Sequence, residues 1–218
     1  MPFPDTRHSA LVGLQHDDES VRRQSYETIV TAYWQPVNNY LRMRWREPEE
    51  NAEDLTQAFF SKAMDAGTFN TYDPARGTFR TYLRTCLDRF VINARKQDSR
   101  RPTLRLDFDV EGPAESAEEV FQHEWIRRLF SLAIEDLRGS LDDIRFRVFE
   151  SYDLAESESR PTYAALAAQF NTTTDRITNY LAAARRDFRK AVLNRLRELT
   201  ANEREFRAEA RAVLGVEL

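Results

Sequence analysis

Between Thr78 and Arg101 the sequence combines a helical pattern of apolar residues with an excess of positive charge. The apolar residues recur at intervals of three and four, which predicts one continuous buried helix face: Phe79, Tyr82, Leu83, Cys86, Leu87, Phe90, Val91 and Ala94. Seven basic residues fall on the other faces and in the tail, against only Asp88 and Asp98: Arg80, Arg84, Arg89, Arg95, Lys96, Arg100 and Arg101. Since the whole chain has a formal net charge of −4, this local excess indicates a place where phosphate groups bind. A solvated basic face is the alternative, and the helix alone does not decide between the two.

The composition favours an all-helical protein. The 218 residues include only six glycines and eight prolines, and long segments have helical periodicity while no convincing run alternates with period two. A single cysteine, Cys86, provides no disulfide framework and favours a reducing compartment; we expect it to be a small core residue. The sequence has neither the pattern of a secretory signal nor a long enough apolar run to span a membrane. We therefore expect a soluble cytoplasmic protein without membrane insertion.

Changes in composition divide the chain into five predicted segments: an N-terminal extension (1–23), a first helical module (24–101), an acidic linker (102–122), a second helical module (123–200) and a tail (201–218). The linker is predicted from its two prolines and its charge, since residues 102–124 hold seven acidic residues and one basic residue. The extension is expected to contain a short helix. The tail is expected to form a short packing helix through Phe206, Ala210, Val213 and Leu214.

The first module is expected to contain one or two helices over residues 20–45, with Pro36 as a kink or a helix start. Five carboxylates then lie within eight residues: Glu47, Glu49, Glu50, Glu53 and Asp54. Asn51 is predicted to cap the next helix, which should run to about Ala66 and end at Gly67. Its predicted buried face consists of Leu55, Phe59, Phe60, Ala63 and Met64. The acids suit a helix start, where the macrodipole favours negative charge, and a divalent metal site is the less favoured alternative.

The second module contains the pattern of a helix-turn-helix. A short helix is predicted around Leu166, Asn171 suits a left-handed turn, and Thr173 can cap a longer helix. The predicted buried face of that longer helix consists of Ile177, Leu181, Ala184 and Phe188. A short helix, a turn of three to four residues and a longer helix with a polar leading edge are typical of DNA-binding domains. Residues 176–197 are also basic, with one acidic residue, Asp187, against Arg176, Arg185, Arg186, Arg189, Lys190, Arg195 and Arg197.

Two small helical modules, each with a basic helix and joined by an acidic linker, resemble the extracytoplasmic-function (ECF) type of bacterial RNA polymerase sigma factor. The resemblance covers about residues 24–101 and 125–197. The segment AEDLTQAFF at residues 52–60 looks like the family's core-polymerase-binding segment. FRTYLRTCLDRFVINARKQDSRR, from Phe79, resembles the helix that reads and opens the minus-ten element, and YAALAAQFNTTTDRITNYLAAARRDF, from Tyr163, is similar to the minus-thirty-five reader.

The sequence departs from the family pattern at three places. Tyr82 stands where the family usually has Trp, and Arg89 stands where it usually has Asn. Residues 178–180 are Thr, Asn and Tyr, where many members carry Lys-Ser-Arg on the recognition helix. The resemblance therefore supports the fold better than it supports any particular promoter sequence.

The resemblance assigns roles to three groups of residues. Polymerase binding falls to Glu53, Asp54, Gln57 and Phe60. Holding the opened minus-ten strand falls to Asn70, Thr71 and Tyr72, which can contact a base, and to Arg80, Arg84 and Arg95, which can hold phosphates. Base reading at the minus-thirty-five element falls to Asp175, Arg176, Asn179 and Tyr180, with Arg185, Arg186 and Arg189 as phosphate anchors. For Tyr72, packing beneath the turn is an equally weighted alternative.

The implied partners are promoter DNA and core RNA polymerase, through the clamp of the largest subunit and the flap of the second largest. The resemblance also leaves room for an anti-sigma protein or a regulatory kinase, with Thr56 as a candidate phosphorylation site, and for control through the extension and the tail. No cofactor, metal or catalytic residue is predicted, since phosphate loops, metal-ligand spacings and nucleophile motifs are absent from the sequence. The alternatives are a stand-alone helix-turn-helix regulator and a helical protein-interaction adaptor.

Overall fold

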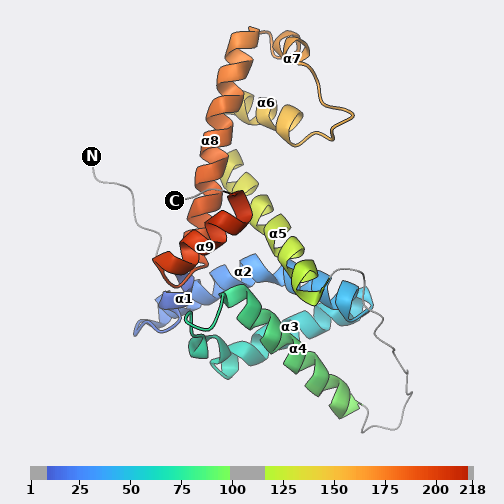
Figure 1. The fold of residues 1–218 in the computed structure, drawn as a ribbon, viewed down its shortest axis with the longest axis vertical. Helices are drawn as coiled ribbons and strands as arrows, with labels where there is room; N and C mark the ends of the chain where they lie inside the picture. The colour runs from blue at the N-terminus through green and yellow to red at the C-terminus, as the bar shows by residue number, and fades with distance from the viewer. Residues whose placement is uncertain (1–8, 99–115, 216–218) are drawn as a thin grey trace. The chain divides into compact units, whose positions relative to one another are not determined.

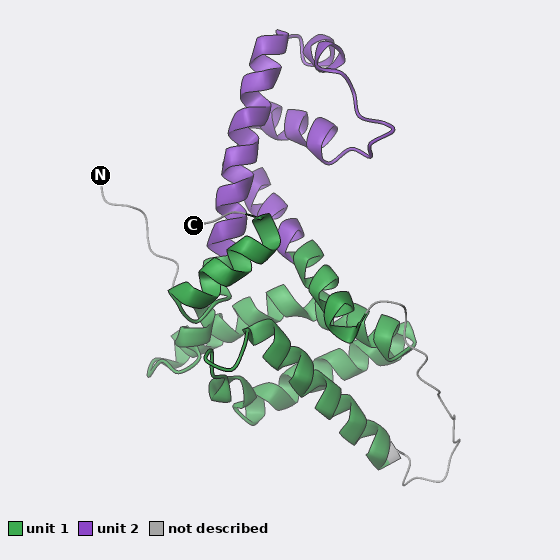
Figure 2. Ribbon diagram, in the orientation of Figure 1, with its two compact units in different colours: residues 1–128, 196–218 green, residues 129–195 purple. Residues whose placement is uncertain are grey.

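The computed structural model describes residues 9–98 and 116–215, and all regular secondary structure in these ranges is helical (Figure 1). The helices are α1 (Ala10–Gly13), α2 (Glu19–Arg44), α3 (Glu49–Asp65), the 3-10 helix η1 (Thr68–Thr71), α4 (Phe79–Asp98), α5 (Ala117–Ser140), α6 (Asp143–Asp153), α7 (Tyr163–Gln169), α8 (Thr174–Glu198) and α9 (Glu203–Leu214). They form two compact units, one of residues 1–128 and 196–218 and the other of residues 129–195 (Figure 2). The prediction of an all-helical protein with two domains is confirmed.

The division into units differs from the predicted segments in two respects. Helix α5 begins at Ala117, inside the stretch predicted as linker, while residues 99–115 of that stretch lie outside the described residues. The predicted tail forms α9, as expected, but α9 belongs to the same unit as the first module (Figure 2). No helix in the described ranges is long and apolar enough to cross a membrane.

The first unit is built on α2, a single helix that continues through Pro36. The Asp18 carboxylate caps this helix by accepting a hydrogen bond from the Ser20 amide at 2.8 Å. Helix α3 begins at Glu49 after Pro48, so the prediction of Asn51 as its cap is wrong: Asn51 lies in the first turn and donates to the Glu47 carboxylate. The predicted end of α3 is confirmed.

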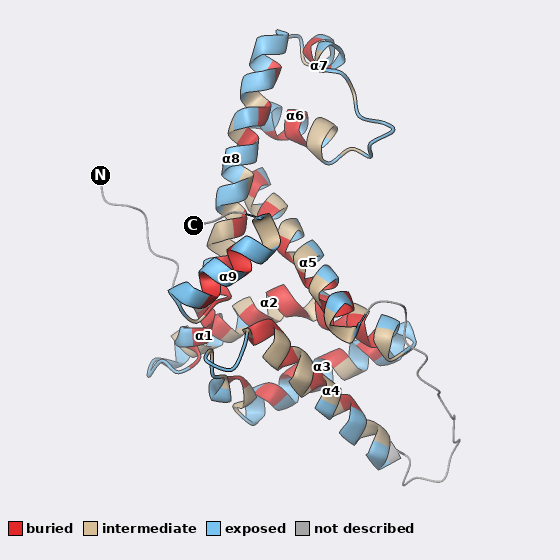
Figure 3. Ribbon diagram, viewed as in Figure 1, coloured by how far each residue is buried: buried red, intermediate tan, exposed pale blue. Residues whose placement is uncertain are grey.

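The core of the first unit joins α2, α3, α4 and the beginning of α5 (Figure 3). Helix α4 contributes a fully buried strip of Phe79, Leu83, Leu87 and Val91. Each of these side chains adds about 1.5–3 kcal/mol when it leaves water, so the strip fixes α4 firmly against its neighbours. The apolar stripe of the sequence is wider than this strip, because Tyr82, Cys86 and Phe90 are only half-buried. On α3, Met64 is 54% exposed, contrary to the predicted core role.

In the second unit, α7, a short turn and the first part of α8 occupy the positions where the sequence predicts a short helix, a turn and a longer helix. Asn171 adopts the left-handed conformation expected of it, with φ 48°. The Thr173 hydroxyl accepts a hydrogen bond from the Arg176 amide at 3.3 Å and so caps α8, again as expected. The helices are held together by a buried cluster of Val148, Leu166, Ala167, Ile177 and Leu181. This core fixes the beginning of α8 as a rigid, largely exposed helix end (Figure 3).

Candidate polymerase and nucleic-acid interface

The side of α3 opposite the core is a polar surface. Glu53, Asp54 and Gln57 are exposed, while Ala52 and Phe59 on the other side are buried. The helix backbone is already ordered by the core, so binding of these carboxylates to a basic partner surface costs only the entropy of the carboxylate side chains. Three of the four residues predicted to contact polymerase therefore share one accessible face.

Phe60 lies elsewhere. It is only 3% exposed, and its ring stacks on Trp34 with the centroids 5.9 Å apart. The structure thus places Phe60 in the core, where it supports α3 rather than offering a surface to a partner.

Thr56 is also buried, with no exposed surface, and its hydroxyl donates to the Ala52 carbonyl at 2.7 Å. A kinase acts on an accessible hydroxyl, so the folded protein does not present Thr56 for phosphorylation. The helical spacing points the same way, because Thr56 precedes Phe59 and Phe60 by three and four residues and so shares their predicted buried face.

The turn between η1 and α4 is positioned by Phe69. This side chain is 4% exposed, and its ring packs edge-on against Phe79 with the centroids 5.5 Å apart. Gly67 allows the sharp exit from α3 because its φ is 58°, a left-handed value that costs glycine little. The turn is therefore ordered by the core, as the sequence predicted.

Two of the three predicted base-contacting residues, Thr71 and Tyr72, line a cavity of about 270 Å³ between this turn and α4. Its remaining lining includes Tyr82, Cys86 and Arg89. This volume is near the lower end of about 300–1,000 Å³ that is typical of small-ligand sites. Burial raises the pKa of the Cys86 thiol, so the cavity wall carries a neutral thiol rather than a thiolate.

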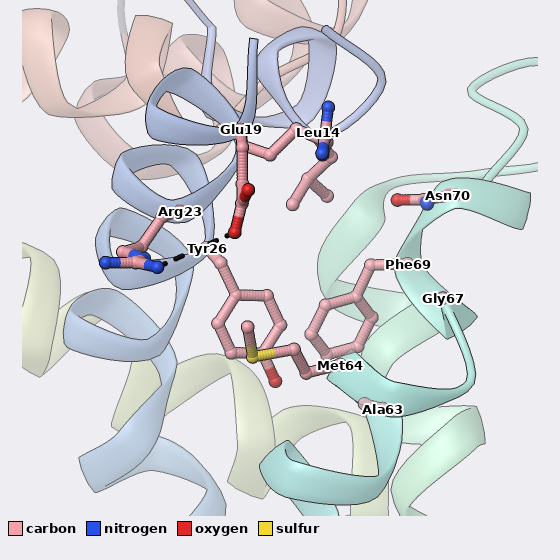
Figure 4. A pocket seen from close by; sticks show the side chains of 10 residues that line it. Leu14, Glu19, Arg23, Tyr26, Ala63, Met64, Gly67, Phe69 and Asn70 are labelled. Atoms are coloured by element: carbon pink, nitrogen blue, oxygen red, sulfur yellow. Dashed lines mark ion pairs between the residues drawn. The ribbon is translucent and has the colours of Figure 1, made fainter. Parts of the chain in front are cut away.

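The third residue, Asn70, lies on the other side of the turn. Its carbonyl accepts a hydrogen bond from the Gln15 side chain at 3.0 Å. Its side chain lines a separate pocket of about 290 Å³, shown in Figure 4, together with Tyr26 and Met64. The structure therefore does not bring Asn70 into the same cavity as Thr71 and Tyr72.

Tyr72 is half-buried and has partners within the first unit. Its hydroxyl lies 2.8 Å from the Gly77 carbonyl oxygen and 2.7 Å from a carboxylate oxygen of Glu205 in α9. Burial and this carboxylate raise the pKa of Tyr72 well above its ordinary value, so the hydroxyl stays protonated and donates. Both alternatives for Tyr72 keep support, since the residue packs under the turn and also borders the cavity.

The three arginines predicted to hold phosphates all have carboxylate partners within the first unit. Arg80 is 8% exposed, lies 3.4 Å from Glu209 and stacks on the Trp125 ring. The other two pairs are Arg84 with Glu118 at 2.7 Å and Arg95 with Glu47 at 2.6 Å. These contacts compete with any binding of phosphate by the same side chains.

Three other cationic side chains are exposed and line a hollow, and the sequence analysis did not assign them a role. Lys62, Arg76 and Arg89 line a larger hollow of about 560 Å³ between α3 and α4, which also includes Tyr82 and Phe90. Arg76 and Arg89 border the smaller cavity as well. Arg89 was visible in the sequence as one of seven basic residues, but periodicity alone did not separate it from the arginines that are paired.

In the second unit, the predicted base readers lie at the beginning of α8. Asp175, Arg176 and Asn179 are exposed there, and Tyr180 is half-buried against the hydrophobic cluster. Tyr180 therefore offers only part of its ring to a partner.

The predicted phosphate anchors lie further along α8 and are all exposed: Arg185, Arg186 and Arg189. Arg185 differs from the other two because its guanidinium donates to both carboxylate oxygens of Asp153, at 2.9 and 2.8 Å. A bidentate pair of this kind holds the side chain in one orientation.

Part of the first unit is similar to a known protein family. Residues 29–101, which run from within α2 to beyond α4, match the family model of Sigma-70 region 2. No curated protein and no solved structure gives a significant match to the chain. The match supports a sigma-70-type factor, a class of non-catalytic transcription factors, with a role in promoter recognition and melting. Region 2 implies binding to core RNA polymerase and to promoter DNA.

Proposed function

We propose that this protein is an ECF-type sigma factor that binds core RNA polymerase, reads promoters through its helix-turn-helix and holds the opened strand at the minus-ten element. The observation that carries the proposal is the combination of a region 2 match over residues 29–101 with the short helix α7, the turn and the longer helix α8 in the same chain. A stand-alone regulator would account for the helix-turn-helix but would leave the region 2 match without a role.

Polymerase capture is assigned to the exposed face of α3. Glu53, Asp54 and Gln57 point away from the core, and the charge of the carboxylates suits a basic surface on the clamp of the largest subunit. The flap of the second largest subunit is the proposed partner of the second unit. An anti-sigma protein would compete for the same surfaces.

Strand capture is assigned to the turn and the cavity beside it. Thr71 and Tyr72 line the space that receives an unstacked base: the Thr71 hydroxyl supplies a hydrogen bond to the base edge, and the Tyr72 ring offers a stacking surface. Arg76 and Arg89 lie beside this space and are exposed, so we assign them to the strand's phosphates in place of the predicted Arg84 and Arg95. Arg76 has a carboxylate partner of its own, but this pair is longer and more exposed, at 3.7 Å from Asp73, than the pairs of Arg84 and Arg95 at 2.7 and 2.6 Å.

Upstream recognition is assigned to α8. Arg176 and Asn179 are exposed at its capped beginning, the part of a recognition helix that reaches base edges in the major groove. Arg186 and Arg189 lie about two to four turns further along. They are assigned to the DNA backbone, which sets the register of the helix but carries no base information.

The proposal is tested by co-purification with core polymerase, followed by transcription in vitro from genomic fragments. Glu53→Lys with Asp54→Lys should abolish co-purification without changing helicity or melting temperature. The matched control is Glu27→Lys with Asp65→Lys, which makes the same charge change at exposed positions of the same unit. Undiminished binding by the first pair would refute the α3 assignment. A helical adaptor would give no promoter-dependent transcription, and a stand-alone regulator would bind promoter DNA without polymerase.

A further inference from the structure

The last described helix, α9, places a carboxylate at the N-terminus of α4. One oxygen of Glu205 accepts hydrogen bonds from the Phe79 amide at 2.9 Å and from the Tyr72 hydroxyl at 2.7 Å. The other oxygen accepts from the Ala201 amide at 2.7 Å. The first amides of a helix have no partner within the helix and carry its positive dipole end, so this is a position that binds anions, phosphate included.

A second observation points to the same place. Arg80, in the first turn of α4, is 8% exposed, and two of its nitrogens, Nε and Nη1, have no hydrogen-bond partner among the described residues. Its third nitrogen, Nη2, lies 3.4 Å from Glu209, whose other oxygen is equally without a partner there. A buried guanidinium with unused N–H donors can bind a ligand that has more acceptor oxygens than a carboxylate has. A phosphate group is such a ligand.

The two carboxylates come from one face of α9. Glu205 and Glu209 are four residues apart and therefore point the same way, toward α4. Phe206 and Ala210 are buried beside them, which gives the helix an apolar hold on the unit. The donors of Arg80 and the acceptor of Glu209 that lack partners make the packing of α9 on the unit less stable, because each buried polar atom without a hydrogen bond costs about 1–3 kcal/mol.

Building on the proposed strand capture, we propose that Phe79 N–H, Tyr72 and Arg80 form a binding site for a backbone phosphate of the opened strand. In the free protein, Glu205 and Glu209 of α9 occupy this site as phosphate mimics, and α9 must leave before the strand binds. Helix α9 is thus a built-in competitor of single-stranded DNA.

The competition has a measurable consequence. A ligand that binds only the α9-released state has an apparent affinity reduced by the fraction of molecules in that state. Weakening α9 should therefore tighten DNA binding, which is the opposite of what loss of a purely structural contact would do.

The test measures binding of a fluorescein-labelled single-stranded DNA of mixed sequence to the full chain, by anisotropy at low salt. Glu205→Gln removes the negative charge and places an amide N–H₂ group, itself a donor, near the N–H and O–H donors that Glu205 accepts from. These contacts are then weakened, so α9 should be released. We expect about tenfold tighter binding, which corresponds to a released fraction of roughly one tenth in the unsubstituted protein. The matched control is Glu203→Gln, which removes the same charge from an exposed position of α9 and should bind as the unsubstituted protein does. Equal affinities for the two variants would overturn the proposal.

Hydrogen exchange supplies a second test that needs no substitution. Single-stranded DNA should speed exchange of the α9 amides in the unsubstituted chain, and continued protection of α9 in the bound complex would overturn the proposal. Inorganic phosphate at matched ionic strength distinguishes the source of the ligand: α9 should stay protected, and its release by phosphate alone would exclude the DNA strand as the specific ligand.

Failure of this inference is separable from failure of the proposed function. Permanganate-reactive thymines at a promoter opened by the holoenzyme report strand opening whether or not α9 competes. If permanganate reactivity is normal and Glu205→Gln binds single-stranded DNA with unchanged affinity, only the competitor role of α9 is refuted. Absence of reactivity with every variant would remove the proposed function and this inference together.

Discussion

Helices α4 and α8 have similar excesses of positive charge in the sequence, but the structure uses their arginines differently. On α4, Arg80, Arg84 and Arg95 each lie within 3.4 Å of a carboxylate of the same unit. On α8, Arg185 has a carboxylate partner in Asp153, whereas Arg186 and Arg189 are exposed to solvent. Counting charges along a helix therefore indicates where cations gather but not whether they are available to a ligand. That distinction depends on which acids the tertiary fold brings to each helix.

The largest expected effect is on stability. Arg80→Ala leaves Glu209 buried without its positive partner and removes the guanidinium from the Trp125 ring, so the first unit should lose about 3 kcal/mol of unfolding free energy. Arg186→Ala should change the second unit by less than about 0.5 kcal/mol, as is usual for an exposed position. Denaturant unfolding followed by circular dichroism measures both. Equal losses would erase the contrast between the helices.

The next effect is on single-strand binding. Arg76→Ala with Arg89→Ala removes two exposed cations beside the cavity, so the slope of log affinity against log salt should become shallower by about 1.4. Permanganate reactivity at the promoter should fall accordingly, while the melting temperature stays unchanged. Arg23→Ala, an exposed arginine on α2, is the control and should leave the slope unaltered. An unchanged slope in the double variant would return the phosphate role to the paired arginines.

A smaller effect is expected within α8 itself. Arg186→Ala should reduce the salt slope of duplex binding by about 0.9, the value for one phosphate contact. Arg185→Ala should reduce it by less, because Asp153 holds that guanidinium in a bidentate pair. Asp153→Ala, which frees Arg185, should steepen the slope. If Arg185→Ala and Arg186→Ala behave alike in a titration of promoter duplex, the ion pair does not restrict the side chain.

The sequence predicted the helices well because each depends on local information. The left-handed Asn171 and the Thr173 cap follow from backbone preference and spacing, and the structure confirms both, while it confirms the apolar stripe of α4 for its central strip alone. The start of α3 was misplaced by three residues, because Pro48 rather than Asn51 is the cap position and makes no side-chain cap hydrogen bond.

The candidate site was predicted only in part, because its contacts are distant in the sequence. Tyr72 and Glu205 are 133 residues apart, and no periodicity connects them. The periodicity of α3 already placed Phe60 on the buried face, and the structure confirms that placement, whereas the resemblance assigned Phe60 to polymerase binding. Charge and spacing thus located the cationic helix, while tertiary packing decided which of its side chains are accessible.

The last prediction concerns pH and sharpens the role of the carboxylates that cover α4. Burial raises the pKa of Glu209 above its ordinary value of 4.5, Arg80 opposes this shift, and the nearby Glu205 and Glu118 add to it. A carboxyl with a raised pKa in the folded state binds its proton more tightly there than in the unfolded chain. Its contribution to stability is therefore fully present below pH 4.5 and is lost as the pH rises through the raised value.

Glu209→Gln provides the comparison, since glutamine does not titrate. The difference in unfolding free energy between the unsubstituted protein and this variant should fall as the pH rises from 4.5, and should level off once Glu209 is ionised in the folded state. Taking the difference cancels the titration of groups that the two proteins share. Denaturant unfolding across this pH range, with hydrogen exchange of α9 alongside, measures the effect. Parallel pH profiles for the two proteins would show that Glu209 ionises as freely in the folded chain as in the unfolded one. The hold of α9 on the first unit would then rest on Glu205 and the apolar contacts alone.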